Sequence, residues 1–263
     1  MTTQAQPAIA ARPDSARFTF GDAVRAEWTK FRSVRSFRWC LAIFALISVL
    51  TSAGFAVAAA MSLYGAETAT MGELVSTTQL GMGLAELVIL VLGILTITGE
   101  YRSGTIRTSL MSVPRRWHLL LAKALVLAAA VAVASQVAAW AAFGIQYASS
   151  ETIGDLGPEM LRVLFGYAPY LAVLAVFGMA IGAVVRHAAG AILAGIGVVY
   201  VLPFLAGLVP HIGEWADEVL PYPSGTELIT MTSDDAWVWF GVCCAWTVVV
   251  LALAIHLTHR RDA

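Results

Sequence analysis

Charged residues are scarce in this chain, and their scarcity excludes an ordinary soluble domain. Only 13% of the 263 residues are Asp, Glu, Lys or Arg, whereas 59% are hydrophobic, and the mean hydropathy is +0.78. Soluble domains carry about 25% charged residues. We therefore expect an integral membrane protein.

Motifs for catalysis, metal binding or nucleotide binding are also lacking. The three cysteines lie in apolar runs without CxxC or Cys/His spacing, so no metal or redox site is predicted. One HxxE occurs, at His211 and Glu214, but no second pair completes a zinc site. Neither GxSxG, HExxH nor the phosphate-binding GxxxxGK[ST] occurs. We expect no catalytic residues, no cofactor and no ATP binding by this chain alone.

Long apolar runs are abundant, and they predict an all-α integral membrane protein with six transmembrane helices. A helix needs about 20 apolar residues to cross the hydrocarbon core. Six runs satisfy this requirement: residues 39–61, 78–98, 119–145, 163–185, 189–209 and 236–257. Only residues 186–188 separate the fourth run from the fifth, which predicts a tight helical hairpin. Residues 1–17 are rich in Ala, Pro, Gln and Thr and predict a disordered cytoplasmic tail, which leaves residues 18–263 as the transmembrane domain.

The basic residues indicate how the chain is oriented. Lys and Arg concentrate on the cytoplasmic flanks of membrane spans. Seven precede the first predicted span, five lie between residues 99 and 123, one is Arg186, and two close the chain. The three connections on the opposite side contain one basic residue, Arg162. We therefore predict a multi-pass protein of the plasma membrane with both termini in the cytoplasm.

A basic amphipathic helix is predicted before the first span, between Thr19 and Ser36. Its apolar stripe consists of Phe20, Val24, Trp28, Phe31 and Val34. Basic residues such as Lys30 and Arg32 occupy much of the remaining surface, and Thr19 with Asp22 resembles a capping box. Such a helix suits the surface of the lipid bilayer, with cations at the headgroups. A helix that covers a soluble partner is the alternative, and nucleic acid is disfavoured because a basic stripe beside a span normally serves lipid.

The connection between the second and third spans, residues 99–123, is more elaborate than topology requires. Gly104 allows a sharp turn after the second span. Thr105–Met111 can then form a short helix, which Pro114 ends. Its apolar contacts would be Ile106, Leu110 and Met111. A short helix between two spans acts as a lever, because a force on it tilts both. A basic loop that serves only topology is the alternative, but it needs neither the Gly nor the Pro.

Glu86 is the one carboxylate inside a predicted span. At 1.5 Å per residue it lies about 20 Å from Glu100, in the outer half of the bilayer. A lone intramembrane acid is a functional candidate by default. Glu86 either lines a substrate path or a subunit seam, or it makes an interhelical hydrogen bond, for example to Gln136 of the third span.

Two pairs of small residues predict close packing between helices. Gly178-x-x-x-Gly182 and Gly190-x-x-x-Ala194 have the spacing that lets helix backbones approach in a membrane. We expect packing within the subunit, with a homodimer seam as the alternative.

Two of these segments together resemble a known family. The run Glu100-Tyr101-Arg102-Ser103-Gly104-Thr105-Ile106-Arg107, followed by Pro114-Arg115-Arg116 and Lys123, resembles the cytoplasmic loop of permeases of type-2 ATP-binding-cassette exporters. Residues 25–36 are similar to the segment before the first span in actinobacterial members. The resemblance covers residues 18–260.

The resemblance implies a role for each part. Residues 105–111 would be the coupling helix that docks on a separate ATPase subunit, with Arg102, Gly104 and Arg107 in the same element. Residues 19–36 would be the interfacial connecting helix. Glu100 would tie the coupling helix to the second span, and residues 211–235 would form re-entrant outer helices. ATP hydrolysis is expected on the partner, not on this chain.

The resemblance also implies partners and a task. Family members without a fused ATPase work as two permease copies, identical or different, with two ATPase chains. We expect export of a small amphipathic or lipophilic compound, of the drug or antibiotic type. A membrane-embedded enzyme and a non-transporting anchor or sensor subunit are the alternatives. The enzyme would be active as a single chain without ATP, and the anchor would tolerate loss of Glu86.

Overall fold

The structure is a computed structural model, and its described residues are almost entirely helical. They are residues 19–60, 68–106, 116–149, 151–153, 157–209, 213, 216, 219–231 and 234–260. The all-α class is confirmed. The exceptions are two short strands, β1 (Thr68–Thr70) and β2 (Glu151–Ile153), which pair in parallel. The predicted disordered tail, residues 1–17, lies outside the described residues.

In the described part of the chain, six helical stretches are long and apolar enough to cross a membrane. They are α2 (Arg35–Ala60), α3 (Met71–Ser103), α5 (Arg116–Ser149), α6 (Pro158–Val185), the composite α7–η1–α8 (Ala188–Gly207) and α11 (Ala236–Arg260). The six predicted spans are therefore confirmed. Most helices extend beyond the predicted apolar runs, because helical hydrogen bonding satisfies the backbone beyond the hydrocarbon as well as within it.

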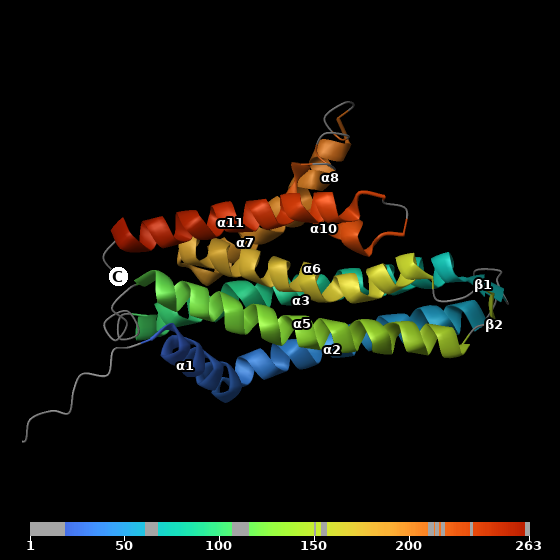
Figure 1. Ribbon diagram of the computed structural model, residues 1–263, viewed down its shortest axis with the longest axis horizontal. Helices are drawn as coiled ribbons and strands as arrows, with labels where there is room; N and C mark the ends of the chain where they lie inside the picture. Colours follow the sequence, from blue (N-terminus) through green and yellow to red (C-terminus); the bar gives the residue numbers. More distant parts are fainter. Residues whose placement is uncertain are drawn as a thin grey trace, which may run out of the picture.

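The fifth crossing is an interrupted helix. α7 (Ala188–Ile196) continues into a π-helical turn, η1 (Gly197–Val201), and then into α8 (Leu202–Gly207). Pro203 has no N–H to donate to the carbonyl of Val199, which weakens the regular ladder here. Figure 1 shows α8 rising away from the direction shared by the long helices. π-helical turns are frequent at functional sites.

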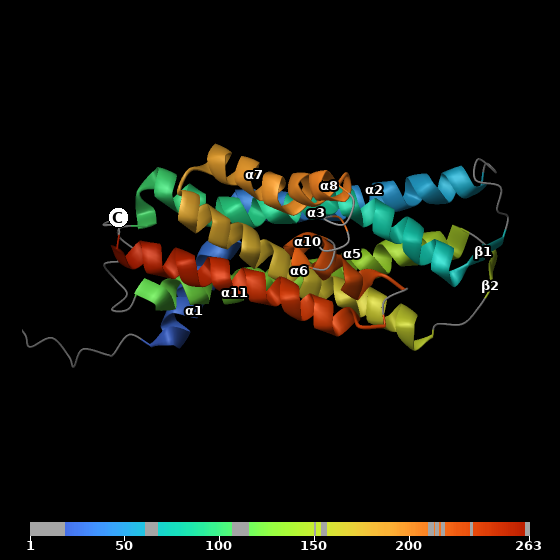
Figure 2. The same ribbon diagram turned by 90° about the horizontal axis from the view of Figure 1, so that it is seen from above.

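α6 lies at the centre of the bundle, in contact with α3, α5 and α11 (Figure 2). Gly178 and Gly182 allow α3 to approach: a Cβ added at Gly178 would lie 2.6 Å from the carbonyl oxygen of Leu90. The predicted packing of this glycine pair within the subunit is confirmed. Gly190 does not contact a distant helix in this way. The atoms nearest to it belong to Val185 and His187 of its own hairpin.

The predicted tight turn at residues 186–188 is also confirmed. Arg186 ends α6 in the left-handed conformation, with φ 62°, and its N–H donates to the carbonyl of Gly182 at 2.8 Å. His187 then caps α7, since its Nδ1 accepts a hydrogen bond from the N–H of Gly190 at 3.3 Å. Two residues with special backbone roles thus reverse the chain.

A short helical segment precedes α11 within the region predicted to be re-entrant. It consists of α10 (Pro221–Thr226) and the 3-10 turn η2 (Glu227–Ile229). The guanidinium of Arg162, on α6, donates to the backbone carbonyls of Glu227, Leu228 and Thr230 at 3.3, 3.2 and 2.9 Å. The lone arginine in the predicted outer connections therefore holds this segment against the bundle.

Gly93 of α3 provides a direct test of the contact between α3 and α6. A Cβ at Gly93 would overlap the backbone carbonyl of Ala175, which cannot rotate away as a side chain could. We expect Gly93→Ala to cost about 1–3 kcal/mol of stability, measured by thermal unfolding of the purified protein. The control is Gly83→Ala, on the same helix with open space around it, which should gain up to about 1 kcal/mol. Equal melting temperatures for the two variants would contradict the packing described here.

Candidate functional site

α1 (Phe20–Ser33) brings the first residues of the site to the end of the bundle where α3 ends and α5 begins, which we name the α1 end. The predicted capping box is present: the N–H of Asp22 donates to the Thr19 hydroxyl at 3.3 Å, and the N–H of Thr19 donates to the Asp22 carboxylate at 2.9 Å. Two hydrogen bonds to the Asp22 carboxylate lower its pKa. The one from the Thr19 hydroxyl has the larger effect, and the one from the Thr19 N–H has the smaller effect. α1 packs on α5, and its buried residues are Ala23, Glu27 and Phe31.

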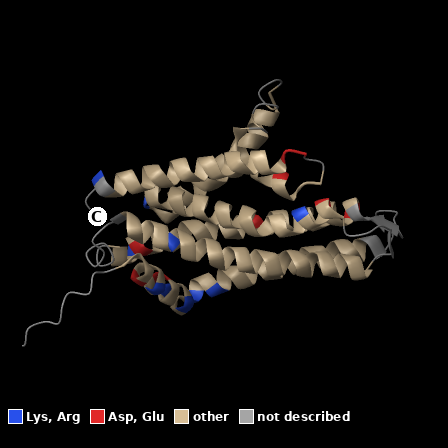
Figure 3. Cartoon of the chain, in the orientation of Figure 1, with Lys and Arg blue, Asp and Glu red and all other residues tan. Residues whose placement is uncertain are grey.

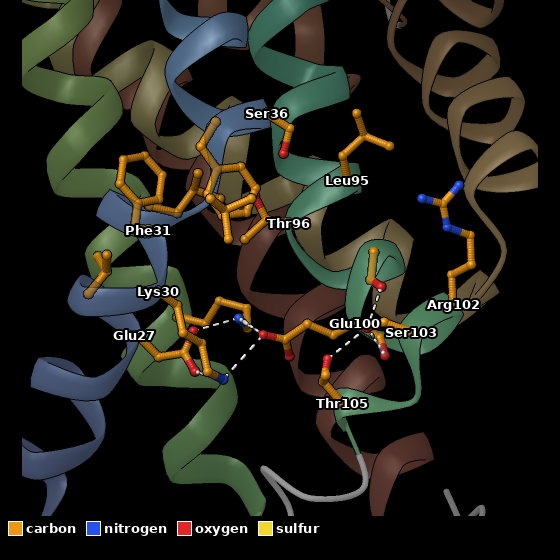
Figure 4. Close-up of a pocket in the computed structure, with 16 residues that line it drawn as sticks. Glu27, Lys30, Phe31, Ser36, Leu95, Thr96, Glu100, Arg102, Ser103 and Thr105 are labelled. Carbon is orange, nitrogen blue, oxygen red and sulfur yellow. Dashed lines mark hydrogen bonds and ion pairs between the residues drawn. The ribbon is translucent and has the colours of Figure 1, made fainter.

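Four charged side chains meet where α1, α3 and α5 come together (Figure 4). We name Glu27, Lys30, Glu100 and Lys123 the ion cluster. Nζ of Lys123 lies 2.5 Å from Oε2 of Glu27 and 2.9 Å from Oε1 of Glu100. Nζ of Lys30 lies 2.8 Å from Oε1 of Glu27 and 3.3 Å from the same oxygen of Glu100. Each charge contacts two of opposite sign, so the four form a closed ring.

The ion cluster is largely removed from water. The side chains of Glu27 and Lys123 are each 4% exposed, and that of Glu100 is 14% exposed. Burial of charge costs free energy, and the pairing of each charge with two of opposite sign offsets part of that cost here. Burial acts to lower the pKa of Lys30, but the hydrogen bonds and charges of Glu27 and Glu100 outweigh it and raise this pKa. Lys30 therefore remains a cation at neutral pH.

A cavity of about 440 Å³ adjoins the ion cluster and is lined by α1, α2, α3, α5 and the turn after α3 (Figure 4). Glu100 lines this cavity, and its second oxygen, Oε2, is buried without a hydrogen-bond partner among the described residues. The end of α3 is thus paired firmly through one carboxylate oxygen, while the other has no such restraint.

The chain leaves α3 by a sharp turn just after Glu100. Gly104 has φ 71°, a left-handed conformation that glycine adopts without strain. The hydroxyls of Ser103 and Thr105 are 2.8 Å apart, Arg102 is exposed, and Ile106 is 4% exposed. The remaining predicted coupling residues, Arg107, Leu110 and Met111, lie outside the described residues, so the coupling helix stays a prediction.

The predicted interfacial residues divide into buried and exposed groups. Phe31 is buried and stacks on Phe37 with ring centroids 5.1 Å apart. Trp28 also stacks on Phe31, with ring centroids 6.3 Å apart, and is 45% exposed, while Arg32 is exposed. Phe31 therefore anchors α1 to the bundle, and Trp28 remains available to the surrounding medium.

Most of the basic residues coloured in Figure 3 lie toward the α1 end of the described structure. The turn between α6 and α7 also lies at this end, because the guanidinium of Arg186 sits over the ring of Tyr101, 5.2 Å from its centroid. Tyr101 follows Glu100 directly, so a second cationic group is linked to the last turn of α3.

Glu86, the second predicted site, lies inside the bundle. It is 1% exposed, and its Oε2 accepts a hydrogen bond from the hydroxyl of Tyr170 at 3.1 Å. The predicted interhelical hydrogen bond is therefore present, but Gln136, the example given as its partner, is wrong, because α6 and not α5 presents the polar group opposite Glu86. Gln136 instead donates to the carbonyl of Leu164 at 3.2 Å. Among the described residues, no group of three or more His, Cys, Asp or Glu could hold a metal ion.

Two members of the ion cluster were not identified as site residues from the sequence. Glu27 lies within the apolar stripe of α1, between the helical positions of Val24 and Phe31, and an acid at such a position is a usable signal. Lys123 was treated as a residue that sets topology and as part of the family-like loop. It lies about one turn inside the third predicted span, and a cation at such a position is a usable signal of a paired charge.

Residues 24–263 match a protein family described as ABC-2 family transporter protein. The chain therefore belongs to the ABC-2 family and is a multi-pass permease subunit of an ATP-binding-cassette transporter. The matched region covers all six membrane-spanning helices and most of α1. No curated protein matches the sequence.

A double-mutant cycle tests the ion cluster. Glu27→Gln and Lys123→Met each leave buried charges short of a partner, and we expect each to cost about 3–5 kcal/mol. The double variant removes both charges and retains the pair of Lys30 with Glu100. It should lose less than the sum of the single variants by about 1–3 kcal/mol, measured by unfolding in mixed micelles. Strict additivity would show that the two side chains do not interact.

Proposed function

We propose that this permease works with a separate ATPase subunit, and that ATP binding and hydrolysis there drive export of a small amphipathic or lipophilic compound across the plasma membrane. Two permease copies, identical or different, and two ATPase chains form the transport unit. Residues 18–263 act as one permease domain. The α1 end and both termini face the cytoplasm, a proposal supported by the fifteen basic residues predicted on that side against one on the other.

The observation that carries this proposal is the position of the ion cluster. Glu100 lies four residues before the turn at Gly104, next to the segment proposed to contact the ATPase. It is paired with Lys30 of α1 and with Lys123 of α5. A displacement of the segment after Gly104 is therefore transmitted to three helices. A loop that served only topology would need exposed cations, not four charges paired in a ring.

The mechanism follows from this linkage. We assign contact with the ATPase to Arg102, Thr105, Arg107, Leu110 and Met111, while the buried Ile106 holds the start of this segment to the bundle. When the ATPase subunits close on ATP, they push this segment, and the ion cluster moves the ends of α3 and α5 together with α1. Trp28, Lys30, Phe31 and Arg32 keep α1 at the membrane surface. The transport pathway between two permease copies then changes from inward-facing to outward-facing by rigid-body movement.

Gly104→Pro tests the coupling segment. Proline fixes φ near −65°, whereas Gly104 has φ 71°, so the turn cannot form as described. We expect the reconstituted permease–ATPase complex to retain ATP hydrolysis while transport falls at least about ten-fold, equivalent to a lost coupling free energy of about 1.4 kcal/mol. Charge reversal at Arg107 should act in the same direction, and membrane insertion should be unchanged for both variants.

Gly99→Ala is the matched control, since Gly99 lies one turn earlier in α3 with open space around it. It should transport normally. Normal transport by Gly104→Pro and Arg107→Glu, with the ATPase still co-purifying, would show that the docking assignment is wrong.

A further inference from the structure

Four tyrosines lie on the elements that pack around Glu86. Tyr167 and Tyr170 come from α6, Tyr200 from η1 and Tyr222 from α10. Tyr170 donates a hydrogen bond to Glu86 at 3.1 Å, and its ring packs against Gly225 of α10, the helix that also carries Tyr222. We name these five residues the Glu86–tyrosine cluster. Three elements that are distant in the sequence, α6, η1 and α10, thus place aromatic rings near one carboxylate of α3.

The Glu86–tyrosine cluster has a buried inner layer and a half-buried outer layer. Glu86, Tyr167 and Tyr170 are at most 1% exposed. Tyr200 and Tyr222 are half-buried, and their rings pack with centroids 4.8 Å apart. The hydroxyl of Tyr200 is nevertheless buried, so this side chain extends from the partly exposed layer toward the interior. The pair of Tyr200 and Tyr222 therefore forms the outer layer of the cluster.

Among the described residues, no Lys or Arg forms an ion pair with Glu86. The hydroxyls of Tyr167 and Tyr200 are buried without a hydrogen-bond partner among the described residues. Buried acids in membranes normally pair, and buried hydroxyls normally form hydrogen bonds. A purely structural contact would satisfy these groups, so the uncompensated acid and unsatisfied hydroxyls point to a bound ligand.

The chemistry of the cluster selects for a monovalent organic cation. A carboxylate supplies the opposite charge, and the faces of tyrosine rings attract cations that have weak hydration shells. An anion would be repelled by Glu86. A hard divalent ion requires six or more oxygen ligands, commonly several carboxylates, and the cluster contains one.

We propose that the Glu86–tyrosine cluster binds the cationic group of a lipophilic ammonium or phosphonium compound, which enters by separating Tyr200 from Tyr222. This inference rests on the proposed export function, because it names the class of substrate. A proton is small enough to neutralise Glu86 while the outer pair is closed. When the pair opens, the organic cation takes the place of that proton. Tyr200 lies in the π-helical turn, where the helix already departs from regular geometry.

The test compares two probes of nearly equal shape and opposite charge on the full-length permease in lipid nanodiscs. Radiolabelled tetraphenylphosphonium should bind saturably at one site per chain, and tetraphenylborate should not compete for that site. Glu86→Gln preserves the size of the side chain and an acceptor for Tyr170, but it removes the charge. We expect it to weaken tetraphenylphosphonium binding at least about ten-fold. Glu86→Asp keeps the charge and should retain measurable binding.

Glu159→Gln is the control, because Glu159 is an exposed acid in the first turn of the same α6 that supplies Tyr167 and Tyr170. It should bind tetraphenylphosphonium like the wild type. Saturable binding of both probes by the wild type, or of neither, would overturn the inference, as would unchanged affinity in a folded Glu86→Gln protein. Each assay is run without ATPase or ATP. Failure of the ATPase to co-purify or to drive transport would count against the proposed function instead.

Discussion

The close contact between α3 and α6 sets the position of the polar groups described above. Helices in lipid gain nothing from hydrophobic exclusion of water, so backbone approach at small residues is what brings them together. Gly93, Gly178 and Gly182 supply that approach. α3 then holds Glu86 opposite Tyr170 within the bundle, while its last turns bring Glu100 to Lys123. Larger side chains at the contact would separate Glu86 from its one described partner and leave an acid unpaired in hydrocarbon.

Glu86 and Glu100, two of the three acids of α3, have contrasting surroundings. Glu100 belongs to a ring of charges whose formal sum is zero, and three helices supply the members of that ring. Such a ring resists displacement of any one member, which suits a mechanical joint. Glu86 has a single hydrogen bond from a neutral hydroxyl, and no cation compensates it among the described residues. That environment leaves its charge to be balanced by something exchangeable, which suits a site of binding and release.

Hydropathy and capping signals predicted the six crossings, the capping box of α1 and the hairpin at Arg186, because each depends on residues that are neighbours in sequence. The partners of Glu86 could not be predicted in this way. Gln136 and Tyr170 are both polar residues on later spans, and the choice between them depends on which helix lies against α3. The pairing of Glu27 with Lys123 likewise depends on how α1 folds back onto α5, 96 residues later. A count of basic residues on each side of the membrane uses Lys123 only to orient the chain, and it predicts no contact for Arg162.

The hydrogen bonds of Arg162 have a consequence for how the outer part of the protein can move. One planar guanidinium holds three backbone carbonyls, so it fixes both the position and the orientation of the segment after α10. Side-chain changes in that segment leave these acceptors in place. α10 and η2 therefore travel with α6, and Tyr222 keeps its place relative to Tyr167 and Tyr170. Any separation of Tyr200 from Tyr222 has to originate on the other side, which makes the π-helical turn between α7 and α8 the hinge.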